Sequence, residues 1–400
     1  MPQAATRTST PELSSLDRLT PSSDRDRVDR DLFAFFEETR RGYASNPHLA
    51  PLYNRLGEFV LRGGKRLRPR LCLASYRILT GRFDPPPVAV TLAASSLEVF
   101  HAFMLVHDDL IDGSVTRRNR ATLHEAIRLD ALQPDHPTER KRSSDLGLIG
   151  GDLLFALGMR LLSRSGLDDC TLGRANRLMA DMLFETGLGE ALDVLYDDCP
   201  LDRLTEDQII ESYLRKTARY SVSGPLVLGA SIAGAHPGVA RALDRFGDLL
   251  GFGFQVQNDL DAFGADLEEG DHPDLDGGKR TYVLWAAYRG LEAEGRRKLV
   301  AALESPVGLD RRRTLLDLIH QSGAIPWCRA RLDVVRRDAV SALAEAPIDA
   351  AQRRQFVALT GLFRASSNRA TDPLPEFTAA MIETDAAVSP VLDTGLAVER

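Results

Sequence analysis

Three aspartates, Asp108, Asp109 and Asp112, crowd into the short run HDDLID in the first third of the chain. Asp108 and Asp112 are four positions apart, so on a helix they share one face, with Asp109 beside them. Carboxylates this close, among apolar neighbours, are costly unless a cation lies between them. They suit a hard divalent cation such as Mg²⁺, which usually takes one or two protein carboxylates plus phosphate oxygens. Taken alone, the run also fits a solvated acidic helix end.

Basic residues flank this run on both sides. Arg117 and Arg118 follow it and offer two guanidinium forks suited to phosphate oxygens. Before it stands GGKRLRP, in which two glycines break a helix and Pro69 fits the first turn of the next. Lys65 and Arg68 would then lie where backbone N–H groups and a helix dipole also attract an anion. A capped turn with solvated basic residues is the alternative.

A second polar run, GFGFQVQNDLDAFGAD, spans residues 251–266. It places Asn258, Asp259, Asp261 and Asp266 among apolar residues at a predicted helix end. This segment could bind metal, and by itself it could equally be a polar helix terminus.

The elements that must position these residues are almost all helical, because we find apolar residues at helical spacing and almost no alternating strand pattern. The helix from Val88 carries the first acidic run. We expect helices over Arg70–Thr80 and Asn176–Tyr196, and a capping box of Thr205 with Gln208. Residues 130–145 read as an exposed loop, with the next helix opening at Leu146.

The predicted organisation is one helical domain over residues 28–364. Residues 1–27 are rich in Ser, Thr, Pro, Asp and Arg, and we expect them to be disordered. Residues 365–400 lack a firm period and are expected to form a loosely ordered tail. The fold class is therefore all-α, mainly one bundle.

Composition excludes several classes of function. A formal net charge of -7 argues against a nucleic-acid partner. No uninterrupted apolar run reaches the length of a membrane span, so we expect no transmembrane segment. The four cysteines are widely spaced, with no CxxC pair, and fit reduced thiols of a cytoplasmic protein better than a disulfide or zinc framework.

Five sequence elements occur in a fixed order along the chain: GGKRLRP, HDDLID with RRNRATLH, the dipeptide KT, GFGFQVQND and GGKRT. In this order they resemble the trans-isoprenyl diphosphate synthases, the polyprenyl synthetase family. The resemblance covers residues 28–364, and five ordered elements are far more specific than any one of them.

The resemblance implies an antiparallel helical bundle around a deep central cavity, usually as a homodimer. It implies head-to-tail (1'-4) condensation of an allylic diphosphate with isopentenyl diphosphate, assisted by three Mg²⁺ ions. It also assigns roles to individual positions. The metal ligands would be Asp108, Asp109, Asp112 and Asp259. The isopentenyl diphosphate pocket would be Lys65, Arg68, His101 and Arg118. The allylic diphosphate pocket would be Arg117, Lys216, Thr217, Gln255 and Lys279. The catalytic group would be Asp108, Asp109, Asp112, Arg117 and Lys216.

The second acidic motif departs from the family's DDxxD, with Asn258 at its first position and Ala262 at its last. An amide carbonyl neutralises less charge than a carboxylate, so the third metal would bind more weakly. The spacing of Asn258, Ala262 and Asp266 faintly resembles the metal triad of terpene cyclases. A cyclase-like enzyme or a partner-dependent subunit is therefore the rival hypothesis, although a cyclase has no use for an isopentenyl diphosphate pocket.

Product length in this family depends on what blocks the growing tail. Phe103 and Met104 lie five and four positions before Asp108, an arrangement that resembles geranylgeranyl (C20) synthases. Two bulky aromatics would favour farnesyl (C15), the alternative product. Phe103 could instead simply pack against a neighbouring helix.

Overall fold

The computed structural model describes residues 19, 21–82, 85–131, 133–263 and 273–362. Their regular secondary structure is helical, apart from one antiparallel two-stranded ladder between β1 (Thr116–Arg117) and β2 (Arg120–Ala121). The all-α prediction is confirmed. Asp266 lies outside the described residues, as does everything beyond residue 362.

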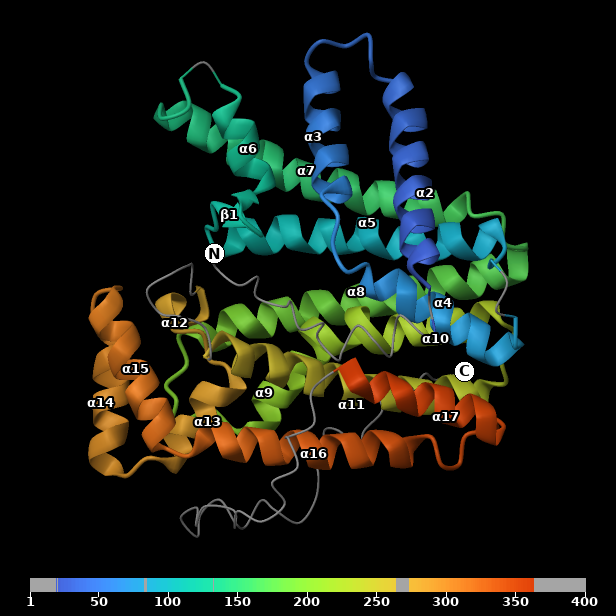
Figure 1. Cartoon of the computed structure of the whole chain (residues 1–400). Helices are drawn as coiled ribbons and strands as arrows, with labels where there is room; N and C mark the ends of the chain where they lie inside the picture. The colour runs from blue at the N-terminus through green and yellow to red at the C-terminus, as the bar shows by residue number, and fades with distance from the viewer. Residues whose placement is uncertain (1–18, 20, 83–84, 132, 264–272, 363–400) are drawn as a thin grey trace, which may run out of the picture. The chain divides into compact units, whose positions relative to one another are not determined.

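The helices group into two compact units (Figure 1). The N-terminal unit takes the described residues of Asp17–Leu178 and Leu228–Ala235, and the C-terminal unit takes those of Met179–Val227 and from His236 onward. The N-terminal unit contains the ladder and the helices α2 (Ser22–Arg41), α3 (Leu49–Leu61), α4 (Leu67–Thr80), α5 (Val88–Ile111), α6 (Leu123–Leu129) and α7 (Pro137–Ser163).

The C-terminal unit is built from α9 (Glu206–Tyr213), η1 (Leu214–Ser223), α11 (Pro237–Ala262), α12 (Pro273–Gly277), α13 (Tyr282–Gly290), α14 (Ala293–Glu304), α15 (Leu309–Gln321), α16 (Ala324–Ala342), α17 (Ala350–Ala358) and η2 (Leu359–Leu362). Two helices, α8 (Asp169–Asp197) and α10 (Gly224–Ile232), have residues in both units.

Helix α5 is the core of the N-terminal unit and lies alongside α7 (Figure 1). Glycines on α7 allow this close approach. A Cβ on Gly151 would stand 2.1 Å from Nε2 of His107, and one on Gly158 would stand 2.9 Å from the Phe100 ring. Such distances leave no room for a side chain. The α7 glycines therefore fix where α5, and with it the first acidic run, can lie.

The hairpin of α2 and α3 stands across α5 (Figure 1) and buries Val28, Leu32 and Phe36. A fully buried ion pair between Arg77 of α4 and Asp24 ties the start of α2 to the unit. This places residues 22–27 in a helix, so the predicted disordered tail ended too late in the sequence. The pairing of Asp24 with a distant arginine explains why local composition misled.

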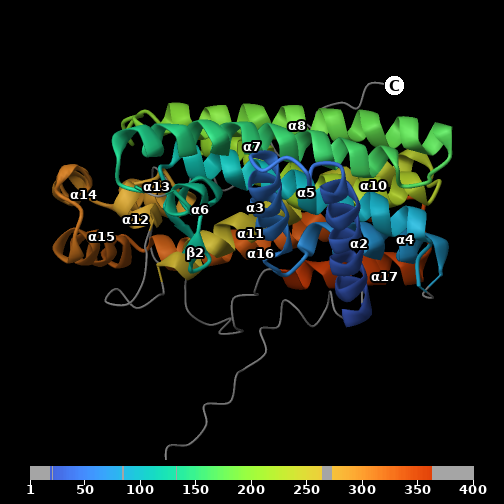
Figure 2. The same ribbon diagram turned by 90° about the horizontal axis from the view of Figure 1, so that it is seen from above.

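In the C-terminal unit, α11 packs against η1 and lies alongside α16, as Figure 2 also shows. Small residues make the α11–η1 contact close, since a Cβ on Gly251 would stand 2.5 Å from Ala218. The segment η1 is a π-helix of ten residues, an uncommon conformation that is often found at functional sites. The contact fixes the backbone that carries Lys216 and Thr217.

Several predicted helix boundaries can be compared with the structure. Val88 does begin α5, and Thr205 with Gln208 does form a capping box. The predicted loop over 130–145 is wrong in its second half, because α7 begins at Pro137. There His136 caps the backbone N–H of Thr138, and a proline in the first turn suits a helix start. Helix α4 also begins three residues earlier than predicted, at Leu67.

Within the described residues, α5 and α7 are long and apolar enough to cross a membrane by length and composition. In α5, 67% of the apolar window is buried inside the protein, and in α7 the share is 44%. A core helix of a soluble protein passes the same test. The composition of α5 and α7 does not by itself support the predicted absence of a transmembrane segment. The burial of their apolar residues inside the protein is what supports that prediction.

Candidate active site

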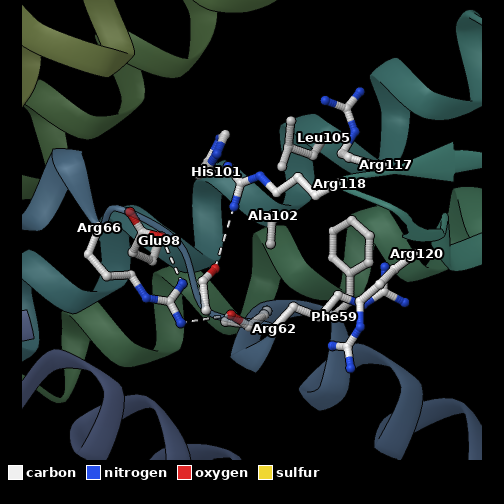
Figure 3. A pocket seen from close by; sticks show the side chains of 12 residues that line it. Phe59, Arg62, Arg66, Glu98, His101, Ala102, Leu105, Arg117, Arg118 and Arg120 are labelled. Carbon is white, nitrogen blue, oxygen red and sulfur yellow. Dashed lines mark hydrogen bonds and ion pairs between the residues drawn. The ribbon is translucent and has the colours of Figure 1, made fainter. Parts of the chain in front are cut away.

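An arginine-rich pocket opens in the N-terminal unit between α3, α5 and the β1–β2 hairpin (Figure 3). Arg118 lies between two groups of side chains, with Arg66, Glu98 and His101 on one side and Phe59 and Arg120 on the other. The full lining is Phe59, Val60, Arg62, Gly63, Arg66, Glu98, His101, Ala102, Leu105, Arg117, Arg118 and Arg120.

Two of the lining arginines hold a strained backbone. Arg66 and Arg118 have φ of 47° and 53°, in the left-handed region that favours glycine. Asn119 follows with φ 58°, so both residues of the two-residue hairpin loop have positive φ, as a type I′ turn requires. Strain of this kind is kept where the surrounding structure enforces it, and it concentrates at binding sites.

The glycine pair before Lys65 makes room for Arg118. The Arg118 Nη1 group donates to the carbonyl of Gly63 at 3.4 Å. A Cβ on Gly64 would stand 2.8 Å from the same Nη1. The missing side chain at Gly64 therefore lets Arg118 lie over the turn, and the hydrogen bond between Arg118 and Gly63 joins positions 55 residues apart into one site.

Arg66 is charge-balanced at the base of the pocket. Its Nη1 donates to Glu98 at 2.9 Å, its Nε donates to Asp29 at 2.7 Å, and its Nη2 donates to the carbonyl of Val60 at 3.1 Å. Arg66 and Glu98 are only 4% and 6% exposed. A buried pair with this many hydrogen bonds fixes geometry more than it adds stability. It holds the turn that carries Lys65.

His101 faces the same pocket from α5. Burial, together with the nearby charges of Arg68 and Arg118, holds the pKa of His101 well below its ordinary value. The imidazole is therefore neutral at physiological pH. A neutral ring adds a hydrogen-bonding group to the arginine cluster without adding repulsion.

The first acidic run ends α5, where Gly113 has φ 62° and terminates the helix behind Asp112. Carboxylates at a helix C-terminus are opposed by the negative end of the dipole and need a cation nearby. Arg117 supplies one: its Nη2 lies 2.6 Å from Asp108 and its Nε lies 2.6 Å from Asp109. The structure thus brings Asp108, Asp109 and Arg117 together.

Asp109 is fully buried, whereas Asp108 is partly exposed and Asp112 is exposed. Burial raises the pKa of Asp109 to about 6, although the positive charge of Arg117 opposes the shift. Its Oδ2 atom is buried without a hydrogen-bond partner. Asp109 is therefore the carboxylate of this run that most needs a further cation or donor.

The side chains of the first acidic run are suitable ligands for a magnesium ion. Asp108 and Asp112 offer hard oxygen ligands one helical turn apart, and Asp109 has an unsatisfied oxygen. Across the part of the chain that the structure describes, no group of three or more acidic, histidine or cysteine side chains forms a ready metal cluster. Bound metal would thus need oxygens from a phosphorylated ligand and water, which is the usual way in which proteins hold Mg²⁺.

Asp259, the predicted ligand in the second motif, is 1% exposed and engaged within the C-terminal unit. Tyr213 donates its hydroxyl to Oδ2 at 2.6 Å, and Gln255 donates Nε2 to Oδ1 at 3.0 Å. The same Tyr213 oxygen accepts the backbone N–H of Tyr282 at 2.8 Å. Asn258, by contrast, is exposed. The geometry gives Asp259 a structural role in joining α9, α11 and α13.

Lys216 also has partners in this unit. Its Nζ lies 2.9 Å from Glu190 and 2.6 Å from Asp193, both on α8. To hold a diphosphate, Lys216 would have to leave these carboxylates or share its charge with them. Sequence reasoning missed both acids, because α8 reads as an ordinary amphipathic helix.

The remaining predicted positions fall on these same elements. Lys65 and Arg68 flank the turn into α4, next to the pocket, and Thr217 follows Lys216 in the π-helix. Lys279 lies in the turn before α13, where its carbonyl accepts the N–H of Thr281 at 2.8 Å. Sequence reasoning also missed Tyr213 and Glu98, whose signal was an acid within the apolar part of α5.

Phe103 packs toward α7. Its ring centroid lies 5.5 Å from Phe155 and 5.0 Å from His107. Met104 is 7% exposed. The packing alternative for Phe103 is therefore part of the observed structure, and its effect on product length remains a prediction.

The sequence of residues 50–311 matches the family model described as polyprenyl synthetase. The match covers more than half of the chain. The chain belongs to the polyprenyl synthetase family. As a family member it is an isoprenyl diphosphate synthase, a prenyltransferase that elongates trans-prenyl chains.

Similar proteins include members with different products. The chain is 30% identical to a geranylgeranyl diphosphate synthase of Sulfolobus acidocaldarius over 58% of this chain and 66% of that enzyme. It is 26% identical to a geranylfarnesyl diphosphate synthase of Aeropyrum pernix over 75% of this chain and 89% of that enzyme. Family membership therefore leaves the product length open.

A solved structure has the same fold. The geranylgeranyl pyrophosphate synthase of Corynebacterium glutamicum, complexed with isoprenyl diphosphate and magnesium, matches with a TM-score of 0.77 and 26% identity. The match covers 85% of this chain and 98% of that protein. The polyprenyl synthetase fold is thus shared over nearly the whole of the described chain.

Proposed function

We propose that this enzyme condenses isopentenyl diphosphate with an allylic diphosphate, head to tail (1'-4) and with Mg²⁺, and that its main product is the C20 geranylgeranyl diphosphate. One observation carries the proposal. Arg117 lines the arginine-rich pocket and at the same time binds Asp108 and Asp109. A phosphate-binding pocket and an acidic metal platform therefore meet at a single side chain.

The chemistry requires such a junction. Cleaving the allylic C–O bond leaves negative charge on the departing diphosphate and positive charge on the carbon. Bound Mg²⁺, held by Asp108 and Asp112, would neutralise the charge that develops on the leaving group. Arg117 would hold the same oxygens with a fixed fork, which costs no reorganisation during the reaction.

The arginine pocket would hold the second substrate. Arg118, with Lys65, Arg68 and neutral His101 nearby, would fix the diphosphate of isopentenyl diphosphate so that its alkene meets the allylic carbon. Apolar side chains of Phe59, Val60 and Leu105 line the same pocket and would keep water from the carbocation. The diphosphate released in the first step is the proposed proton acceptor.

A cyclase-like enzyme, or a subunit that needs a partner, is the second candidate. It is favoured by the second acidic motif, where Asp259 is buried and hydrogen-bonded and Asn258 replaces a carboxylate. A cyclase would release a hydrocarbon or alcohol from an allylic diphosphate alone. It would gain nothing from an isopentenyl diphosphate pocket, so the arginine-rich pocket of the N-terminal unit favours elongation.

Product analysis decides between the two. The purified chain is incubated with Mg²⁺, isopentenyl diphosphate and each of the C5, C10 and C15 allylic diphosphates, and products are separated by chain length. Longer diphosphates, mainly C20, are the expected result, and a C15 end point would favour the farnesyl alternative. Hydrocarbon or alcohol without any longer diphosphate would refute elongation.

Phe103→Ala tests the proposed control of product length. Removing the ring deletes contacts with Phe155 and His107 and opens space beside α5. We expect the mean product to lengthen by one or more C5 units. Phe155→Leu serves as the control on the α7 side, because it loosens the same aromatic cluster without shortening the side chain on α5. An unchanged product in Phe103→Ala would assign Phe103 to helix packing alone.

The cofactor and assembly proposals follow the family. We propose three Mg²⁺ ions per site, a homodimer and a cytoplasmic location. The half-exposed apolar side chains of Leu148, Ile149 and Leu153 on α7 support a covered face. Sedimentation equilibrium of the purified chain, without detergent, tests the dimer.

A further inference from the structure

The arginine-rich pocket has more arginines than carboxylates available to pair with them. Arg66 pairs with Glu98 and Asp29, and Arg117 pairs with Asp108 and Asp109. The other three lining arginines form no ion pair with any described residue. They are Arg62, Arg118 and Arg120.

Arg62 is the least expected of these three. It ends α3, half-buried, with its guanidinium carbon 4.8 Å from the Phe59 ring centroid and its Nη1 donating to the carbonyl of Ala121 at 2.5 Å. Burial and the charge of Arg120 lower its pKa. Two guanidinium groups close enough to repel, one of them desolvated, are unfavourable unless an anion joins them.

The hairpin that positions Arg118 also positions Arg120. Arg117 pairs with Arg120 across the ladder, and the tight turn between them sets Arg118 at its tip. Arg62 holds the far end of the same hairpin through Ala121. All three arginines without an ion pair therefore belong to, or are hydrogen-bonded to, the β1–β2 hairpin that lines the pocket.

We propose that Arg62 and Arg120 are further substrate-binding residues, which hold the outer phosphate of a diphosphate monoester in this pocket beside Arg118. A single phosphate carries about −1.5 to −2 at pH 7, so three guanidinium groups suit a diphosphate better than a monophosphate. The apolar lining from Phe59, Val60 and Leu105 suits a short hydrocarbon tail on that diphosphate.

This inference rests on the proposed elongation reaction, since it assigns the pocket to isopentenyl diphosphate. It adds two residues to which the resemblance assigned no role: Arg62, just before GGKRLRP, and Arg120, within RRNRATLH. Arg62 and Arg120 touch the ligand directly in this proposal, whereas Arg66 and Glu98 only hold the turn beneath it.

The test uses R62Q and R120Q, with R55Q as the matched control. Arg55 lies on the same helix, α3, and is paired with Asp130 and Glu58 outside the pocket. Calorimetry without Mg²⁺ measures binding of isopentenyl diphosphate, inorganic pyrophosphate and orthophosphate to the full chain. We expect both pocket variants to bind the two diphosphates about tenfold more weakly, R55Q to match wild type, and orthophosphate to bind poorly throughout.

Steady-state kinetics supply the second measurement. R62Q and R120Q should raise KM for isopentenyl diphosphate about tenfold while KM for the allylic substrate stays within twofold, and R62K and R120K should recover part of the loss. Arg120 is exposed on the hairpin, so R120Q remains informative if R62Q folds poorly. Wild-type affinity in R120Q, or equal rises in both KM values, would overturn the proposal while leaving elongation intact. A wild-type chain that makes longer products shows the proposed function whatever these variants do.

Discussion

The two units carry charge in opposite ways. In the N-terminal unit, Arg62, Arg118 and Arg120 lack carboxylate partners among the described residues, and Asp109 keeps a buried oxygen unsatisfied. In the C-terminal unit, two of the predicted ligand-binding groups already have internal partners. Asp259 is held by Tyr213 and Gln255, and Lys216 is held by Glu190 and Asp193. The first region is prepared for external ions, and the second is satisfied internally.

The contrast shows that a residue can match a family motif without being available to bind a ligand. Asp259 stands in a recognisable motif, yet its hydrogen bonds serve the packing of α9 against α13. Arg62 and Arg120 stand outside the assigned positions, yet they line the arginine-rich pocket.

The largest effect is expected for Asp108→Asn. This change removes one negative charge from the metal platform and one of the two carboxylates that hold Arg117. We expect kcat to fall about a thousandfold or more, because both metal and arginine act on the leaving diphosphate. Product formation under saturating substrates measures it, with Asp145→Asn, on the surface of α7, as the control. A loss under tenfold would remove Asp108 from the reaction centre.

Gly64→Ala tests the prepared geometry of the arginine pocket. A methyl group there would stand 2.8 Å from Arg118 and would also have to adopt φ of 141°. We expect KM for isopentenyl diphosphate to rise about tenfold as Arg118 is displaced. Gly63→Ala is a matched control, with φ of 85° and nothing within 4 Å of its added methyl. Equal effects in the two variants would mean that backbone strain, and not the contact with Arg118, is responsible.

Tyr213→Phe tests whether Asp259 is structural. The variant leaves a buried carboxylate and the Tyr282 N–H each short of a partner. We expect the free energy of unfolding to fall by about 2–3 kcal/mol, measured by urea titration, with Tyr288→Phe as the control. If Asp259 were mainly a metal ligand, the same variant would weaken Mg²⁺ dependence and leave stability nearly unchanged.

The smallest effect is a pH dependence centred on Asp109. Its pKa is raised to about 6 in the folded chain, above the ordinary value of 3.8, so the folded state binds the proton more tightly than the unfolded state. A raised carboxyl pKa stabilises the protonated folded state, and this contribution declines as pH rises from about 4 to about 6. Without metal, the difference in unfolding free energy between wild type and Asp109→Asn should therefore change across this window. A constant difference from pH 4 to 7 would contradict the shifted pKa.

Much of the fold could be predicted from the sequence because its signals are local. Apolar periodicity identified α5 from its first residue, and the Thr205–Gln208 pattern identified the start of α9. The failures involve distant partners. The composition of residues 22–27 is that of a polar tail, but the ion pair of Asp24 with Arg77 holds them in the fold. The composition of residues 137–145 is that of a loop, but His136 and Pro137 form the start of α7.

The site divides in the same way. Asp108, Asp109, Arg117 and Arg118 could be named from their spacing, since adjacent positions and one hairpin bring them together. Glu190 and Asp193, which pair with Lys216, could not be named from the sequence, because α8 reads as an ordinary amphipathic helix. Charge balance is a property of three-dimensional neighbours, so sequence spacing identified the donors and acceptors but not which of them remain available.

The double contact of Arg117 has a thermodynamic consequence. While its fork spans Asp108 and Asp109, those oxygens are shared with a tethered cation that a divalent ion must displace. Once displaced, the same fork is free to grip a phosphorylated ligand. Each ligand therefore removes an obstacle to the other, and reciprocity requires that the two enhance each other's affinity equally.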